Sequence, residues 1–276
     1  MAEPAGTRAQ SVAAHADDTM TAAAIIACEM IEDETRLAIA QAFPAGTHPP
    51  VVWIESALHE RPGKLQAALD GLIVRLDEGA GGGETVAVKS VRPGTGPVSS
   101  RTELVEVGPS GDLLLGFGYC GGGLKELVSH HRRLVFPRSD DCISLFLDGG
   151  CDRGKATRDA HSYYLTKGWF CHQSSMTDSF DDWVKRYGAE RAAQLRGLMF
   201  ANYKRISLID TGAYPVDEWL EHSEARADEL ELEHEIVPGS VDLLARLFAG
   251  NWDTTDIVVL EPGQPIGIGY LFNMGE

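Results

Sequence analysis

The sequence alternates short apolar runs with longer segments of helical periodicity, and this alternation limits the possible folds more than any other feature. Apolar runs typical of buried strands occur at 22–28, 50–56, 112–120, 133–142, 204–212, 233–237 and 256–265. Between them, apolar residues recur every three or four positions, as at 62–78 and 239–250. Strands that alternate with helices usually pair in parallel through right-handed crossovers. The sequence therefore predicts an α/β protein with mostly parallel sheets and helices on both faces, in a Rossmann-like three-layer arrangement.

The organisation expected along the chain is simple. Residues 1–22 are polar and small and are interpreted as a disordered leader. Residues 23–276 form one α/β domain or two lobes, about 23–160 and 161–276, which could be pseudo-repeated halves. The stretch 79–111 is rich in Gly, Pro and Ser and is interpreted as an insertion that carries a two-stranded excursion.

Charge and composition exclude several classes of function. The formal net charge is −17, which argues against a nucleic-acid-binding surface because a phosphate backbone requires clustered Lys and Arg. No segment has the roughly 18 consecutive apolar residues of a membrane helix, and the first residues do not resemble a secretory signal. Five cysteines without an export signal indicate free thiols in a reducing compartment, so a cytoplasmic location is expected.

Three of the cysteines fall where predicted strands end. Cys28 ends the run AAAIIAC, Cys120 ends DLLLGFGYC, and Cys142 follows RLVFP at the start of a predicted helix. In parallel sheets ligands bind at the carboxyl ends of the strands, and adjacent strands lie about 5 Å apart. If the three strands are neighbours, the loops that follow them bring three thiols together. The alternative is that the three side chains are small apolar members of the core.

A cluster of three thiols suits a soft metal centre. Zinc is held by thiolates, and an iron–sulfur cluster with one open iron also requires three of them. The glycines Gly121, Gly122 and Gly123 follow Cys120, and Cys142 opens a helix, so both settings are expected to favour the thiolate by lowering the thiol pKa. The cofactor is therefore expected to be zinc or an iron–sulfur cluster.

Several neighbouring residues complete the candidate site. His59 is a candidate fourth metal ligand or else a surface histidine, and Glu55, four residues earlier, is a candidate general base. Asp141 could transfer a proton or could merely cap the helix that starts at Cys142. Arg138 and the three glycines could bind an anionic group, although GFGYCGGG fits neither the dinucleotide fingerprint nor the Walker loop. Cys151 and Cys171 lie in polar, loop-like stretches and are not expected to be ligands.

Several segments resemble the bacterial and archaeal family known as domain of unknown function 1638. In order, they are IACEM, ESALHERPGKLQ, LLLGFGYCGGGL, LVFPRSDDCISLFL, YYLTKGW, KRISLIDTG and DIVVLEPGQPI, and they span roughly 24–266. The family has no settled activity and is often encoded beside corrinoid-dependent methyltransferase systems. The resemblance implies Cys28, Cys120, Cys142 and His59 as the site. This chain departs from the pattern in having Asp141 where relatives show His, and in the insertion at 79–111.

Three functions remain open from the sequence. The leading hypothesis, suggested by the resemblance, is a metal-dependent enzyme of one-carbon or methyl-group metabolism, a methyltransferase or related transferase that acts on a small-molecule substrate. The second is an accessory protein without chemistry of its own, which holds a cluster or a corrinoid, or which assists a corrinoid protein or methyltransferase subunit. The third is a metal-free α/β protein that binds an anionic small molecule through GFGYCGGG.

Overall fold

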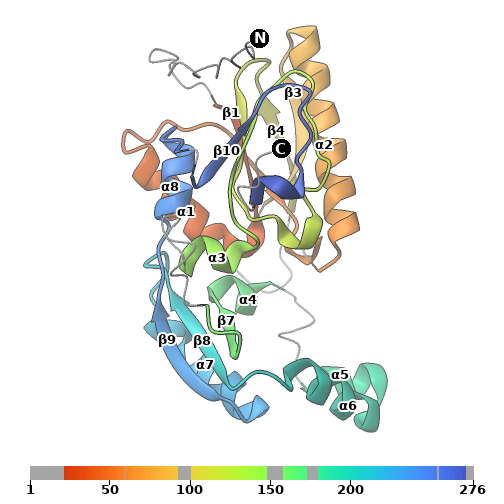
Figure 1. Cartoon of the computed structure of the whole chain (residues 1–276), viewed down its shortest axis with the longest axis vertical. Coiled ribbons are helices and arrows are strands. Elements are labelled where there is room, and N and C mark those ends of the chain that lie inside the picture. Colours follow the sequence, from red (N-terminus) through yellow and green to blue (C-terminus); the bar gives the residue numbers. More distant parts are fainter. Residues whose placement is uncertain are drawn as a thin grey trace, which may run out of the picture.

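A five-stranded sheet forms the upper part of the molecule (Figure 1). The computed structural model describes residues 22–58, 60–92, 101–147, 158–172, 180–253 and 255–271. The strand order is β10-β6-β5-β1-β2, formed by β1 (Ala22–Cys28), β2 (Val51–Ile54), β5 (Asp112–Leu115), β6 (Leu134–Pro137) and β10 (Ile257–Leu260). All pairs are parallel except β6 with β10. Strands β1, β5 and β6 are therefore consecutive, as the cysteine hypothesis requires.

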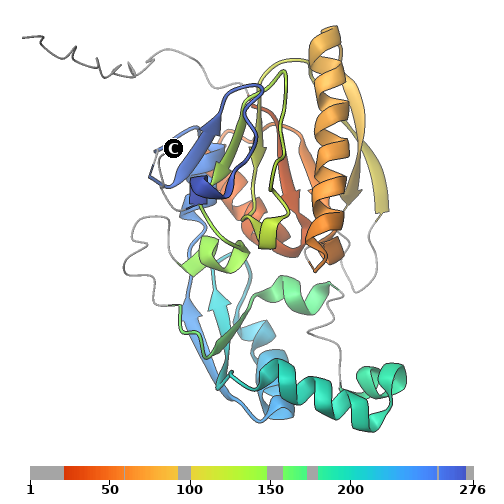
Figure 2. The ribbon, with the colours of Figure 1, turned by 45° about the vertical axis from the view of Figure 1, so that its right-hand side comes forward.

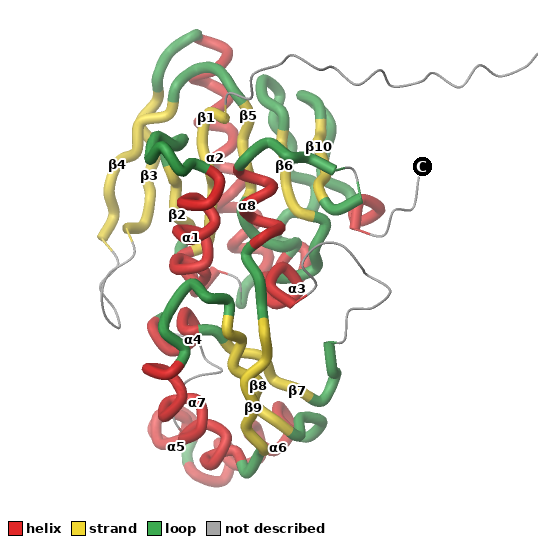
Figure 3. The backbone as a smooth tube through the Cα atoms, turned by 90° about the vertical axis from the view of Figure 1, so that its left-hand side faces the viewer, coloured by secondary structure: helices red, strands yellow, loops and turns green. Residues whose placement is uncertain are grey.

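Helices cover both faces of this sheet and make three layers (Figures 1 and 3). Helix α2 (Pro62–Gly82) lies on one face, whereas α1 (Glu32–Ala42) and α8 (Asp242–Phe248) pack together on the other. The strands are buried on both faces, so their side chains are apolar at nearly every position, as in β1 and β5. The predicted α/β class and the mostly parallel sheet are confirmed.

A second sheet of three parallel strands forms the lower part (Figure 2). Its order is β7-β8-β9, and its strands are β7 (Ser162–Leu165), β8 (Arg205–Asp210) and β9 (Glu233–Pro238). The helices of this part are α4 (Lys167–Cys171), α5 (Phe180–Tyr187), α6 (Ala189–Phe200) and α7 (Asp217–Leu230). The short helix α3 (Cys142–Leu147) and α4 lie between the two sheets (Figure 1).

The predicted insertion at 79–111 contributes two strands beside the edge strand β2, although its first residues, 79–82, belong to α2. Strands β3 (Val86–Arg92) and β4 (Arg101–Val107) pair antiparallel, and the Ser90 hydroxyl accepts a hydrogen bond from the Trp53 backbone N–H at 2.9 Å. The side chains of Val86, Val88 and Val107 are buried in the main core. The expected two-stranded excursion is present, and part of it is buried in the main core.

The chain returns to the first sheet at its carboxyl end. The second sheet begins near residue 160, where the two-lobe hypothesis placed a boundary. However, β10 is a strand of the first sheet, and α8 packs against α1 and β6 of the upper part. Of the predicted leader, residues 1–22, all but Ala22 lie outside the described residues, and Ala22 is the first residue of β1. In the part of the chain that the structure describes, no helix has both the length and the apolar character needed to cross a membrane.

Candidate functional site

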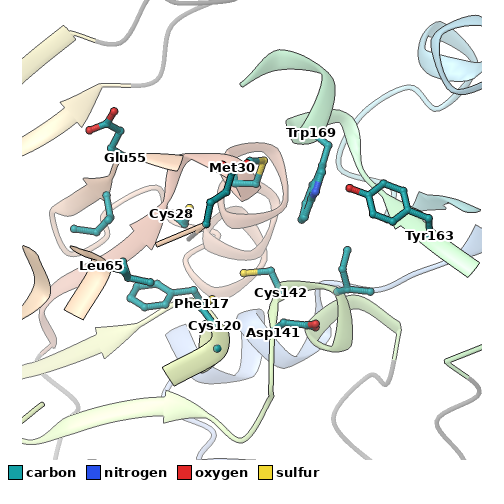
Figure 4. Close-up of a pocket in the computed structure, with 14 residues that line it drawn as sticks. Cys28, Met30, Glu55, Leu65, Phe117, Cys120, Asp141, Cys142, Tyr163 and Trp169 are labelled. Carbon is teal, nitrogen blue, oxygen red and sulfur yellow. The ribbon is translucent and has the colours of Figure 1, made fainter. Parts of the chain in front are cut away.

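Cys28, Cys120 and Cys142 line one cavity at the carboxyl edge of the five-stranded sheet (Figure 4). The cavity has a volume of about 360 Å³. Cys120 and Cys142 lie close enough to affect each other's ionisation, and both interact electrostatically with Cys28. The fold thus brings together three residues that are far apart in the sequence.

Close contact between two loops explains why Cys120 and Cys142 meet. Beyond the ends of β5 and β6, the N–H groups of Tyr119 and Cys120 donate to the carbonyls of Ser139 and Asp140 at 2.9 Å each, so the two segments stay paired. A Cβ atom on Gly118 would lie 2.5 Å from the carbonyl carbon of Asp141. Only glycine lets the backbones come this close.

The segment after Cys120 is a tight turn. From the sequence, CGGGLKELVSH is expected to be a turn that opens a helix, and this expectation is wrong because no helix follows the turn. Residues Cys120–Gly122 form a single 3₁₀ turn, η3. The φ angles of Cys120, Gly121 and Gly122 are 49°, 64° and 102°, which a right-handed helix does not permit. Cys120 is not a glycine, so holding it in the left-handed region costs roughly 1–2 kcal/mol. Strain of this kind is concentrated at functional sites.

The pKa of Cys120 is raised, not lowered as the glycine turn suggested, and the pKa of Cys28 is raised as well. The interaction with Cys142, together with burial, raises the pKa of Cys120 well above its ordinary value. Burial also raises the pKa of Cys28, and the nearby Cys142 adds to this effect. The low local polarity and the mutual repulsion of neighbouring sulfurs outweigh the glycine turn. Without a bound cation, Cys28 and Cys120 are neutral thiols at physiological pH.

The arrangement of possible metal ligands is incomplete. Among the described residues, no group of three or more His, Cys, Asp or Glu side chains is arranged so that it could hold a metal ion. The donor chemistry of the pocket nevertheless suits a soft cation, since three neighbouring thiols offer sulfur ligands and repel one another once ionised. His59, the predicted fourth ligand, and Cys151 lie outside the described residues. Cys171 ends α4 and does not line the cavity.

The predicted acid–base residues both border the cavity. Glu55 is exposed and lies at the mouth of the cavity, above Cys28 in Figure 4. Asp141 accepts a hydrogen bond from the Ser144 N–H at 2.8 Å, as a cap of α3 does, and its other oxygen is 2.7 Å from Arg158. The capping alternative for Asp141 is therefore the one that its contacts support.

The predicted anion-binding groups do not converge on the cavity. Gly121 lines it, but the N–H groups of Gly122 and Gly123 already donate to the carbonyls of Tyr119 and Cys120. The guanidinium of Arg138 instead donates to the carbonyls of Thr255 and Tyr270 and ties β6 to the carboxyl-terminal segment. These two N–H groups are engaged in hydrogen bonds within the turn, so they are not available to bind an anion.

Sequence reasoning missed a buried polar group beside Cys28. Glu29 is only 2% exposed, accepts a hydrogen bond from the Ser56 hydroxyl at 2.9 Å, and lies 3.5 Å from Nδ1 of His172. Its partners come from η2 (Ser56–Leu58) and from the end of α4. The position of Glu29 directly after a buried strand is the sequence signal that could have identified it, because ligand-binding sites lie at the carboxyl ends of parallel strands.

Two aromatic residues from the lower part close the cavity. Tyr163 of β7 and Trp169 of α4 line it opposite Phe117 (Figure 4). Helix α4 packs closely against the first residues after β1. The contact is so close that a Cβ atom on Gly168 would lie 1.7 Å from the Met30 carbonyl oxygen, so only glycine fits there. The Lys167 ammonium, next to it, is 2.9 Å from Asp33.

Together, the fold and the site define an α/β protein with three cysteines and an apolar pocket at the carboxyl edge of a parallel sheet. The chain belongs to the family described as protein of unknown function (DUF1638), whose model matches residues 101–248, more than half of its length. Cys120 and Cys142 fall inside the matched segment, whereas Cys28 precedes it. No curated protein and no solved structure matches the chain.

Proposed function

We propose that the protein is a metal-dependent enzyme in which Cys28, Cys120 and Cys142 hold zinc or an iron–sulfur cluster and promote transfer of a small group. The observation that carries the proposal is the convergence of these three thiols on one cavity. Because the described side chains are not arranged as a ligand set, the thiols must turn about their χ1 bonds on binding. One-carbon or methyl-group transfer is the reaction class suggested by the resemblance.

The bound metal would supply Lewis acidity, which lowers the pKa of a small nucleophile or polarises the transferred group. Around it, the chain has a role for several residues. Trp169 and Tyr163 exclude water from the cavity, and Glu55 at its mouth can accept a proton from the nucleophile. Glu29, held by Ser56, fixes the backbone and the charge next to Cys28.

Elemental analysis of protein purified without oxygen tests this proposal. We expect about one zinc or one cluster per chain, with a cluster revealed by its brown colour. The substitutions Cys28→Ser, Cys120→Ser and Cys142→Ser should each lower the bound metal at least tenfold, because each removes one of the three sulfur ligands of the proposed site. Cys171→Ser is the matched control and should keep full occupancy, since Cys171 does not line the cavity.

Folding of each variant is checked by its thermal unfolding. Wild-type protein without metal after anaerobic purification and reconstitution would overturn the proposal, as would folded Cys→Ser variants that bind as much metal as wild type. Bound metal with turnover of a methyl donor supports the enzyme. Bound metal and a tight complex with a corrinoid protein, without turnover, would instead establish the accessory role.

A further inference from the structure

We infer that the phenol of Tyr163 is the hydrogen-bond donor for a substrate in the cavity, and that this substrate is a small uncharged molecule with an apolar body and an acceptor oxygen, such as a carbonyl. The inference rests on the cavity being the site proposed above, but it does not depend on which metal is bound. It names the class of substrate and the residue that orients it, both of which the proposed function leaves open.

The hydroxyl group of Tyr163 has no hydrogen-bond partner among the described residues. By contrast, the oxygen of the buried Tyr164 accepts a hydrogen bond from the Asp159 N–H at 3.0 Å. The buried Tyr214 hydroxyl donates to the Ile209 carbonyl. In Figure 4 the Tyr163 oxygen points from β7 toward the cavity. A phenol that leaves solvent normally finds a partner, so the cavity is where an acceptor for this group binds.

Two aromatic rings hold the Tyr163 side chain in place. Its ring contacts the rings of Phe200 and Tyr203 edge to face, with the centroids 5.6 and 5.2 Å apart. Burial raises the pKa of the Tyr163 phenol, and the nearby Tyr203 and the charge of Glu60 add to this effect, while Arg226 opposes it. The group is therefore a protonated donor in a fixed position, and a donor fixed in advance loses less entropy when a ligand binds.

The charged groups in the described lining of the cavity are engaged elsewhere or lie at its mouth. Asp141 is 2.7 Å from the Arg158 guanidinium, and Glu60 also has an interaction partner. Glu55 is exposed, and in Figure 4 its carboxylate points away from Cys28. Neither Lys nor Arg is among the described residues that line the cavity. A charged ligand would lose its hydration there without gaining a counter-charge, whereas an uncharged one would not.

The rest of the described lining suits the apolar body of such a molecule. Cys142 lies between the side chains of Tyr163 and Phe117 in Figure 4, and Leu65 lies next to Phe117. At about 360 Å³ the cavity is in the size range of small-molecule sites. A molecule whose oxygen meets Tyr163 and whose body meets Phe117 therefore passes over Cys142, beside the proposed metal. The other apolar side chains of the lining are those of Met30, Ile54, Ile143 and Trp169.

The test compares four probes of nearly equal shape by calorimetry on the full-length protein. Acetophenone carries an acceptor carbonyl, α-methylstyrene has a carbon–carbon double bond in its place, benzoate is an anion and benzamidinium is a cation. We expect benzoate and benzamidinium to bind at least about tenfold more weakly than acetophenone, because the cavity compensates neither charge. A charged probe that binds as tightly as acetophenone, or no binding of acetophenone, would overturn the inference.

Tyr163→Phe assigns the effect to the phenol, because it removes only the hydroxyl group. It should weaken the binding of acetophenone about fivefold or more, since the carbonyl is then buried without a donor, and leave that of α-methylstyrene unchanged. Tyr203→Phe is the matched control and should leave both unchanged, because Tyr203 does not line the cavity. If Tyr163→Phe binds both probes as wild type does, the phenol is not the donor.

Metal content is measured on the same samples, so that the two proposals can fail separately. Full metal content without an effect of Tyr163→Phe contradicts only the substrate class inferred here. The Tyr163→Phe effect in a protein that cannot bind metal contradicts only the proposed function.

Discussion

Glu34 is a buried carboxyl group whose ionisation the fold opposes. It is 1% exposed on α1, and the Thr211 hydroxyl donates to it at 3.4 Å from the end of β8. Burial raises the pKa of Glu34 to about 7, and the charge of Asp33 adds to the effect, while Thr211 and Lys167 oppose it. Between about pH 4.5 and 7, Glu34 is therefore mostly protonated in the folded protein and mostly ionised in the unfolded chain.

The sign of the pH dependence follows from this difference. Where the folded state binds more protons than the unfolded state, the free energy of unfolding falls as pH rises. The ionisation of Glu34 alone should lower the free energy of unfolding by about 3 kcal/mol between pH 4.5 and 7.5. Glu34→Gln should remove this part of the decline, because an amide stays neutral.

Urea unfolding at pH 4.5, 6 and 7.5 measures the effect as the difference between the variant and wild type. The exposed Glu84→Gln is the matched control and should follow the wild-type curve. If Glu34→Gln and wild type lose stability in parallel across this range, Glu34 does not hold the extra proton.

At the scale of elements, local periodicity was enough to predict most strands and helices, because the apolar runs at β1, β8 and α2 are set by burial in their own neighbourhood. It failed after Cys120, where left-handed φ angles form a turn in place of the expected helix. It located the strands that the three cysteines follow, but it left open whether these strands are neighbours, and the sheet order shows that β1, β5 and β6 are. The closing wall of Tyr163 and Trp169 comes from another sheet, and no local pattern specifies contacts between distant elements.

The docking of α4 provides a prediction at this scale. In Gly168→Ala the new methyl group would overlap the Met30 carbonyl oxygen, so α4 must move and carry Trp169 away from the cysteines. We expect a loss of more than about 2 kcal/mol in stability, as for other overpacked positions, together with a shift in tryptophan fluorescence. Thermal unfolding and emission spectra measure the two effects.

Gly197 in α6 is the matched control, because nothing lies within 4 Å of a Cβ atom placed there. Gly197→Ala should stabilise the protein by up to about 1 kcal/mol through helix propensity. A Gly168→Ala protein as stable as wild type, with unchanged emission, would show that α4 does not need the close approach to Met30.

At the scale of the whole molecule, the first sheet is completed by residues from the far end of the chain. Strand β10 pairs with β6 over four residues on each strand, and α8 packs against α1. The antiparallel direction of β10 could not be predicted, because its short apolar run is compatible with either direction and many largely parallel sheets carry an antiparallel edge strand.

Truncation after residue 240 tests this dependence. The shortened chain retains the three cysteines but loses α8 and β10, exposing the buried faces of β6 and α1. We expect it to lose cooperative unfolding and to recover it when the peptide 241–276 is added, as measured by circular dichroism in urea. A truncated chain that unfolds with the wild-type midpoint would contradict this view of the sheet.

The connections that lead into and out of the lower part lie side by side. The Ser240 N–H, just after β9, donates to the Phe146 carbonyl in α3 at 2.9 Å. The chain therefore leaves and re-enters the upper part at neighbouring places, and α4 also contacts the upper part, where Lys167 lies 2.9 Å from Asp33 and Gly168 lies against Met30. The family model covers Tyr163 and Trp169 as well as Cys120 and Cys142, so relatives are expected to keep this wall together with the sulfurs.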